Sequence, residues 1–162
     1  MSRSKLITFI ALITLAFAGA LVADALAGEK GNVVVRDVFF SAGYTSAKVP
    51  DLEGHVMNLI EAKGMSFSEK WGSCLLTMSA TQDYTKGVGP YQGYIHYTYP
   101  DASTITIKIT GEGKGSSRGE GTWTYLKGSG RFEGIEGGGT REYTVLGPGQ
   151  WYADAEGEYT LP

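Results

Sequence analysis

The chain has 162 residues and a formal net charge of −3 at pH 7, with 14 Lys and Arg against 17 Asp and Glu. No run of basic residues stands out, which makes nucleic acids and anionic lipid surfaces poor partners. Cys74 is the only cysteine, so a disulfide within the chain is excluded and stability must come from packing.

Residues 1–27 differ from the rest of the chain. Two basic residues precede an almost wholly apolar stretch at residues 6–22, and residues 25–27 read Ala-Leu-Ala. A basic N-terminus, an apolar stretch and small residues at the cleavage site are typical of a secretory signal peptide. The alternative is an uncleaved membrane anchor, for which the run is at the short end of the ~17–25 residues needed. We therefore expect cleavage before Gly28, one domain over residues 28–162, a periplasmic or extracellular location, and no stable membrane insertion after cleavage.

Apolar and polar residues alternate in most segments after residue 27, as they do in half-buried strands. The clearest run is residues 103–110, where Ile105, Ile107 and Ile109 share one face and Lys108 lies on the other. In chain order, the alternating runs are residues 33–40, 55–61, 76–81, 91–99, 103–110, 121–126, 140–146 and 151–159.

Turn-forming residues separate these runs, for example at Lys86-Gly87, Gly89-Pro90 and Gly147-Pro148-Gly149. About eight strands with short links predict an all-β fold, an antiparallel up-and-down meander. Closing the meander into an eight-stranded barrel would remove its exposed edges. An open sandwich of the same strands is the alternative.

Glycines dominate the stretch GSGRFEGIEGGGT at residues 128–140. A dinucleotide fingerprint fails here because Glu133 takes the place of its last glycine, and the Gly-Glu-Gly segments at residues 111–113 and 119–121 fail in the same way. Glu133 and Glu136 would also repel phosphate. The stretch is therefore predicted to be scaffold. We expect a hairpin turn at residues 128–130, a short strand at residues 131–135 and a bulge or corner at residues 137–139.

The same stretch, together with the later "DAEGEYTL" and the earlier "YPDASTITIKITGEG", resembles the allene oxide cyclase-like barrels, whose fold is shared with plant dirigent proteins. The resemblance covers residues 33–161. It implies an eight-stranded barrel with a ligand cavity, often assembled as homo-dimers or homo-trimers. No catalytic residue is carried over, because the cyclases' catalytic glutamate has no clear counterpart here. The cyclases also act on a plastid lipid epoxide, whereas this chain begins with an export pattern.

A barrel with its charged faces outward would direct many aromatic residues into the lumen. Small residues at Ala153, Ala155 and Gly157 leave space on one wall, which predicts a slot for a flat or oily molecule. The alternative is that the aromatic residues fill the core. The predicted ligand-binding residues are Tyr97, Tyr99, Trp123, Tyr125, Tyr143, Trp151, Ala155 and Tyr159.

Candidate catalytic residues are few. Asp37 and Glu61 are the carboxylates expected to face the lumen, where a raised pKa would permit acid–base work; a position at the rim in water is the alternative. His55 is expected to point inward, and His96 outward. Cys74 is expected to be a buried small apolar residue. No metal or cofactor motif is present.

These patterns leave three functions open. The first is an exported protein that binds an apolar small molecule. The second is a cyclase or isomerase that acts by confining its substrate. The third is a structural or interaction module with a filled core. A lumen rich in aromatic residues and poor in acid–base groups favours the first.

Overall fold

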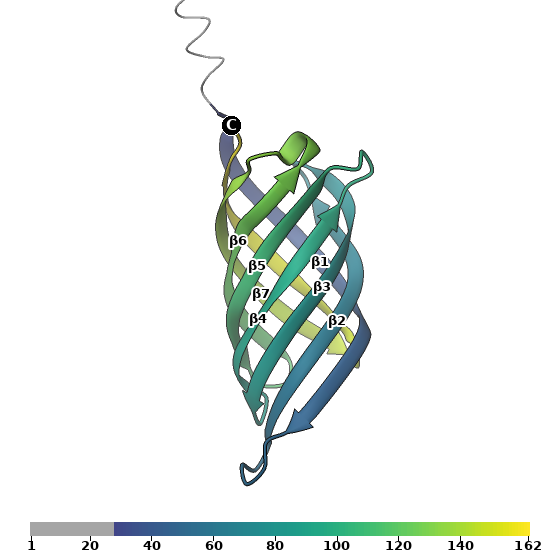
Figure 1. Cartoon of the computed structure of the whole chain (residues 1–162), viewed down its shortest axis with the longest axis vertical. Coiled ribbons are helices and arrows are strands. Elements are labelled where there is room, and N and C mark those ends of the chain that lie inside the picture. Colours follow the sequence, from purple (N-terminus) through teal and green to yellow (C-terminus); the bar gives the residue numbers. More distant parts are fainter. Residues whose placement is uncertain (1–27) are drawn as a thin grey trace, which may run out of the picture. The chain divides into compact units, whose positions relative to one another are not determined.

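The structure, a computed structural model, describes residues 28–162, so the predicted signal peptide lies outside the described residues. Each strand pairs antiparallel with the next, and β8 closes onto β1 to complete a barrel over residues 30–161 (Figure 1). The predicted all-β, eight-stranded, up-and-down barrel is therefore confirmed, and the open sandwich is wrong. The elements are β1 (Lys30–Lys48), β2 (His55–Ser68), β3 (Gly72–Thr85), β4 (Val88–Thr98), β5 (Thr104–Lys114), β6 (Arg118–Ser129), the 3-10 helix η1 (Gly130–Phe132), β7 (Glu136–Gly147) and β8 (Gln150–Thr160).

Alternation along the strands decides which residues fill the barrel. On β5, Ile105, Ile107 and Ile109 are buried, and the residues between them are more exposed. On β4, Tyr97 is buried as predicted, whereas His96 is exposed and faces outward. Among residues 28–162, no helix is long and apolar enough to span a membrane.

Strand β2 departs from the predicted facing. Its buried face includes the polar residues Asn58 and Ser66, and its more exposed face carries most of the apolar side chains. The residues on this outer face include His55, Met57, Leu59 and Glu61. The expectation that His55 and Glu61 point into the lumen is therefore wrong.

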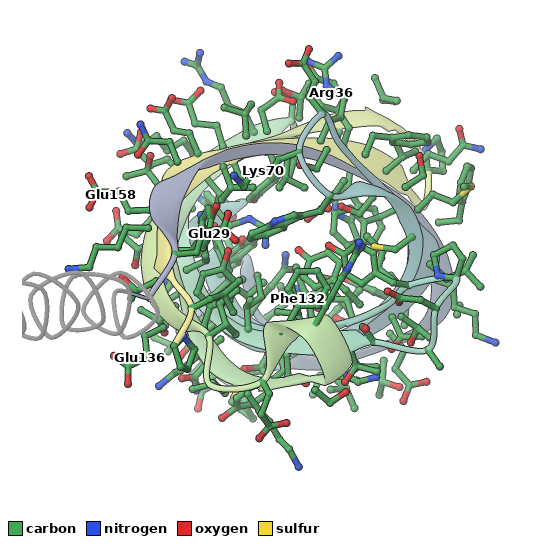
Figure 2. All side chains as sticks on the ribbon, turned by 90° about the horizontal axis from the view of Figure 1, so that it is seen from above. Glu29, Arg36, Lys70, Phe132, Glu136 and Glu158 are labelled. Carbon is green, nitrogen blue, oxygen red and sulfur yellow. The ribbon has the colours of Figure 1, made fainter. Side chains whose placement is uncertain are left out.

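Aromatic side chains close the end of the barrel that carries η1. Phe132 of η1 lies on the inner side of this helix (Figure 2) and is fully buried. Its ring centroid is 5.2 Å from that of Trp71 and 4.8 Å from that of Tyr99. Trp71 also packs on Tyr159, with centroids 5.0 Å apart. These contacts leave little open space at this end.

The glycine-rich stretch belongs to this closure. Strand β6 continues to Ser129 and η1 follows directly, so the hairpin turn at residues 128–130 and the short strand at residues 131–135 are wrong. A Cβ at Gly128 would lie 1.8 Å from the carbonyl oxygen of Phe132, so only glycine lets η1 fold back so closely. Residues 137–139 pair with β8 without a bulge. The stretch is scaffold, as predicted.

Candidate ligand-binding site

The other end of the barrel contains a cavity of about 390 Å³. Turn residues such as Gly87, Gly115 and Gly149 lie at its mouth, and its wall is mainly apolar. This volume is within the roughly 300–1,000 Å³ of small-molecule sites. Apolar lining residues include Val56, Ile60, Met78, Ala80, Ile109 and Trp151.

Three tyrosines supply polar groups to this cavity. Tyr84, Tyr91 and Tyr143 each lie over a glycine of β5 or β6, where a Cβ would collide with ring or hydroxyl atoms. The hydroxyls of Tyr84 and Tyr143 are 3.1 Å apart and form a hydrogen bond. The Gly-Glu-Gly segments at residues 111–113 and 119–121 therefore make room for aromatic rings rather than for phosphate.

Tyr91 and Arg141 belong to one row of paired residues that runs around the barrel. Tyr91 of β4 pairs with Gly111 of β5, Gly111 with Gly121 of β6, and Gly121 with Arg141 of β7. The Tyr91 hydroxyl lies 2.6 and 2.7 Å from the positions that a Cβ would take at Gly111 and Gly121. The tyrosine therefore reaches across both glycines toward Arg141. On its other side, Arg141 pairs with Ala155.

The guanidinium of Arg141 is buried in the lumen. The residue is 4% exposed, and its guanidinium carbon lies 5.9 Å from the ring centroid of Phe39. Phe39 stacks on Trp151 with centroids 5.2 Å apart. Within residues 28–162, Nε of Arg141 has no hydrogen-bond partner. Buried arginines are normally paired, so this nitrogen is a donor without an acceptor in the described residues.

Asp37 is a second buried charged residue, 1% exposed. The hydroxyl of Tyr97 donates a hydrogen bond of 2.9 Å to its Oδ2, while Oδ1 has no partner in the described part of the chain. Burial raises the pKa of Asp37, and the charge of Arg141 opposes this rise. Asp37 borders a separate void of about 30 Å³, which has room for about one water molecule.

No protein-family model matches the chain, and no curated protein matches it in sequence. Among solved structures, the chain is similar to the pterocarpan synthase dirigent protein GePTS1, with 12% identity, a TM-score of 0.47, and coverage of 83% of this chain and 89% of that one. A second similar structure is the pterocarpan synthase dirigent protein PsPTS1, with 11% identity, a TM-score of 0.43, and coverage of 84% and 96%. Both are dirigent proteins.

The predicted ligand-binding residues divide between the two ends of the barrel. Only Tyr143 and Trp151 line the large cavity. Tyr159 is buried against Trp71 at the closed end. The remaining five border the 30 Å³ void: Tyr97, Tyr99, Trp123, Tyr125 and Ala155.

The predicted slot beside Ala153, Ala155 and Gly157 does not coincide with the large cavity, which none of these three residues lines. A Cβ at Gly157 would lie 2.7 Å from the ring of Trp123. Ala155 pairs with Arg141. Gly157 therefore accommodates the ring of Trp123, and Ala155 borders the small void rather than the large cavity.

The candidate catalytic residues do not come together. His55 contacts Asp83 on the outer face, and Glu61 is exposed. Asp37 borders the small void rather than the large cavity. Cys74 is buried as predicted, and burial raises its pKa to about 11. In the described residues, no group of His, Cys, Asp and Glu could hold a metal ion.

Sequence reasoning missed Arg141, Tyr84 and Asn58 as lining residues. Arg141 precedes the inward-facing Tyr143 by two residues, so the alternation along β7 places both on the same face. That signal was present in the sequence, but arginine is rarely buried. Tyr91 begins the alternating run at residues 91–99 and is not among the predicted ligand-binding residues.

Proposed function

We propose that this chain is an exported protein that binds one apolar small molecule in its 390 Å³ cavity. The observation that carries the proposal is the cavity itself, which is open at the turn end of a barrel whose other end is plugged by Phe132 and Trp71. A core filled by its own side chains, the structural alternative, would leave no space of this size.

The energetics favour an apolar ligand. Most of the cavity wall is carbon, contributed by residues such as Val56, Met78 and Trp151. Removing apolar surface from water contributes ~25 cal/mol per Å², so a ligand that fills the cavity gains several kcal/mol before the cost of its immobilisation. Phe39 and Trp151 stack side by side in the wall, which gives a flat or chain-like ligand an aromatic surface.

The lining supports binding over acid–base catalysis. No Asp, Glu, His or Cys among the described residues lines the large cavity. Its titratable groups are Arg141 and tyrosines, and burial raises the pKa of Tyr84 and Tyr91 above the usual value. Such groups are poor proton acceptors at neutral pH. No specific feature of this cavity favours an isomerase that acts only by confining its substrate.

The test is a fluorescence titration with N-phenyl-1-naphthylamine, a neutral apolar probe. We expect one probe to bind per chain. Val56→Phe, which adds bulk to the cavity wall, should weaken binding at least tenfold. The control is Leu75→Ser, because Leu75 is 63% exposed on the outer face of β3 and should not contribute. Loss of binding in Leu75→Ser with unchanged binding in Val56→Phe would place the probe on the outer surface and reject the proposal.

Export and assembly are separate parts of the proposal. Export is supported by the pattern of residues 1–27, and we expect N-terminal sequencing of protein from its source to begin at Gly28. A mature chain that retains Met1 would contradict export by cleavage. Assembly into homo-dimers or homo-trimers stays a prediction from the family resemblance, to be checked by native mass spectrometry.

A further inference from the structure

Two residues that line the large cavity carry buried donors without acceptors in the described part of the chain. Arg141 and Tyr91 are 4% and 7% exposed, and both line the cavity. Neither Nε of Arg141 nor the hydroxyl of Tyr91 has a hydrogen-bond partner among residues 28–162. Buried polar groups are nearly always satisfied, so an exception needs an explanation. Two exceptions of the same kind in one cavity indicate a group that the ligand supplies.

The two donors converge. Tyr91 and Arg141 are separated by the paired glycines Gly111 and Gly121, and the tyrosine hydroxyl reaches over both. Burial raises the pKa of Tyr91, and the charge of Arg141 opposes this rise. The opposing effect reflects the proximity of the two side chains. A guanidinium with a neighbouring hydroxyl is an arrangement that binds an oxyanion through charge-assisted hydrogen bonds.

Several of the remaining polar groups of the cavity are already paired with each other. Tyr84 and Tyr143 satisfy each other, and Asn58 donates to Gln82 at 3.2 Å. Among the described residues, Oδ1 of Asn58 is the one partnerless buried side-chain atom on this cavity's lining residues that can only accept a hydrogen bond, whereas the hydroxyl of Tyr91 can donate or accept.

The buried carboxylate of Asp37 interacts with the charge of Arg141 but lies outside the large cavity. Asp37 borders the small void and not the large cavity, whereas Arg141 lines both. No ion pair joins Asp37 to Arg141 in the described residues, and Tyr97 donates to the carboxylate instead. The large cavity is therefore lined by a cation and by no anion.

We propose that the ligand has an acidic head, a carboxylate in the simplest case, which binds Arg141 and Tyr91 while its apolar body fills the remainder of the cavity. This inference rests on the proposed function and adds the chemical class of the ligand. It assigns Arg141 and Tyr91 as the residues that select among apolar molecules of similar size.

The experiment is displacement of N-phenyl-1-naphthylamine by three compounds with the same chain and different heads: decanoate, 1-decanol and decylamine. At about pH 7.5, where decanoate is ionised, we expect its Kd to be at least about tenfold lower than that of decanol. Decylamine should be the weakest of the three. Equal Kd values for decanoate and decanol, with the neutral probe still bound, would overturn the acidic head and leave the proposed function standing. Failure of the wild type to bind the neutral probe would reject both.

Substitutions test whether Arg141 and Tyr91 are the residues that bind the acidic head. Arg141→Met should reduce the ratio of the two Kd values to about one, and Tyr91→Phe should reduce it by about threefold. Arg141→Lys should keep part of the preference because it retains the charge, and it serves if the methionine variant does not fold. Leu75→Ser on the outer face should keep the wild-type ratio. An unchanged ratio in Arg141→Met or in Tyr91→Phe, with a normal thermal melt, would show that the residue does not bind the head.

Discussion

The hydroxyl of Tyr91 occupies the space that a side chain at Gly121 would need. A Cβ at this glycine would lie 2.7 Å from the hydroxyl and 2.1 Å from the carbonyl oxygen of Thr110. Gly121 in turn pairs with Arg141. The glycine on β6 is thus what allows the tyrosine of β4 to approach the arginine of β7.

Gly121→Ala should therefore destabilise the barrel, because the added methyl collides with a backbone oxygen that has little freedom to move. We expect a cost of ~1–3 kcal/mol and a thermal midpoint lower by roughly 5 °C or more. Gly147→Ala is the matched control, since a Cβ there has no atom within 4 Å, and its midpoint should stay close to that of the wild type. Equal midpoints for the two variants would contradict the close approach.

Asp37→Asn should change how stability depends on pH. Burial raises the pKa of Asp37 above its ordinary value of 3.8, so the folded state favours the protonated carboxyl. The resulting stabilisation is fully present below pH 3.8 and is lost as pH rises through the raised pKa. The asparagine variant lacks this titration.

The measurement is the midpoint of the wild type minus that of Asp37→Asn, taken between about pH 3.5 and pH 8. We expect this difference to decrease as pH rises. A difference that increases with pH would show that the ionised carboxylate is favoured, with the charge of Arg141 outweighing burial.

Cys74 should be unreactive in the folded protein. It is buried, and burial raises its pKa to about 11, so almost no thiolate exists at about pH 8 and reagent has no access. Ellman's reagent should leave the native chain unmodified and should titrate one thiol per chain in denaturant. Rapid reaction of the native protein would contradict the burial of β3.

The fold was largely predictable because apolar and polar side chains alternate along each strand that has one clearly apolar face. The isoleucines of β5 and Tyr97 of β4 lie as expected for this reason. The pattern predicts the wrong facing for strand β2 because its buried face contains Asn58 and Ser66 while its outer face carries most of the apolar side chains. An expectation based on hydrophobicity alone then assigns the outer face of such a strand to the lumen.

The site was less predictable because its position depends on which end of the barrel is plugged. The sequence pattern predicts a short strand around Phe132, whereas η1 directs this residue into the barrel beside Tyr99. The aromatic residues near η1 pack on one another, and the free volume remains at the opposite end. Small residues such as Gly157 accommodate the ring of Trp123. No local sequence pattern distinguishes a small residue that faces a ligand from one that faces a neighbour.

The most direct test of the cavity compares the same substitution at two lumen positions. Ala80 lines the large cavity, whereas Ala155 borders the small void beside Arg141. We predict that Ala80→Leu weakens binding of N-phenyl-1-naphthylamine at least tenfold with little change in thermal midpoint, because the added carbons enter open space. Ala155→Leu should instead overpack a filled region, at a cost of ~1–3 kcal/mol, and still bind the probe. Unchanged binding in Ala80→Leu, together with a large loss of stability in that variant, would show that the lumen is already full and would contradict the account.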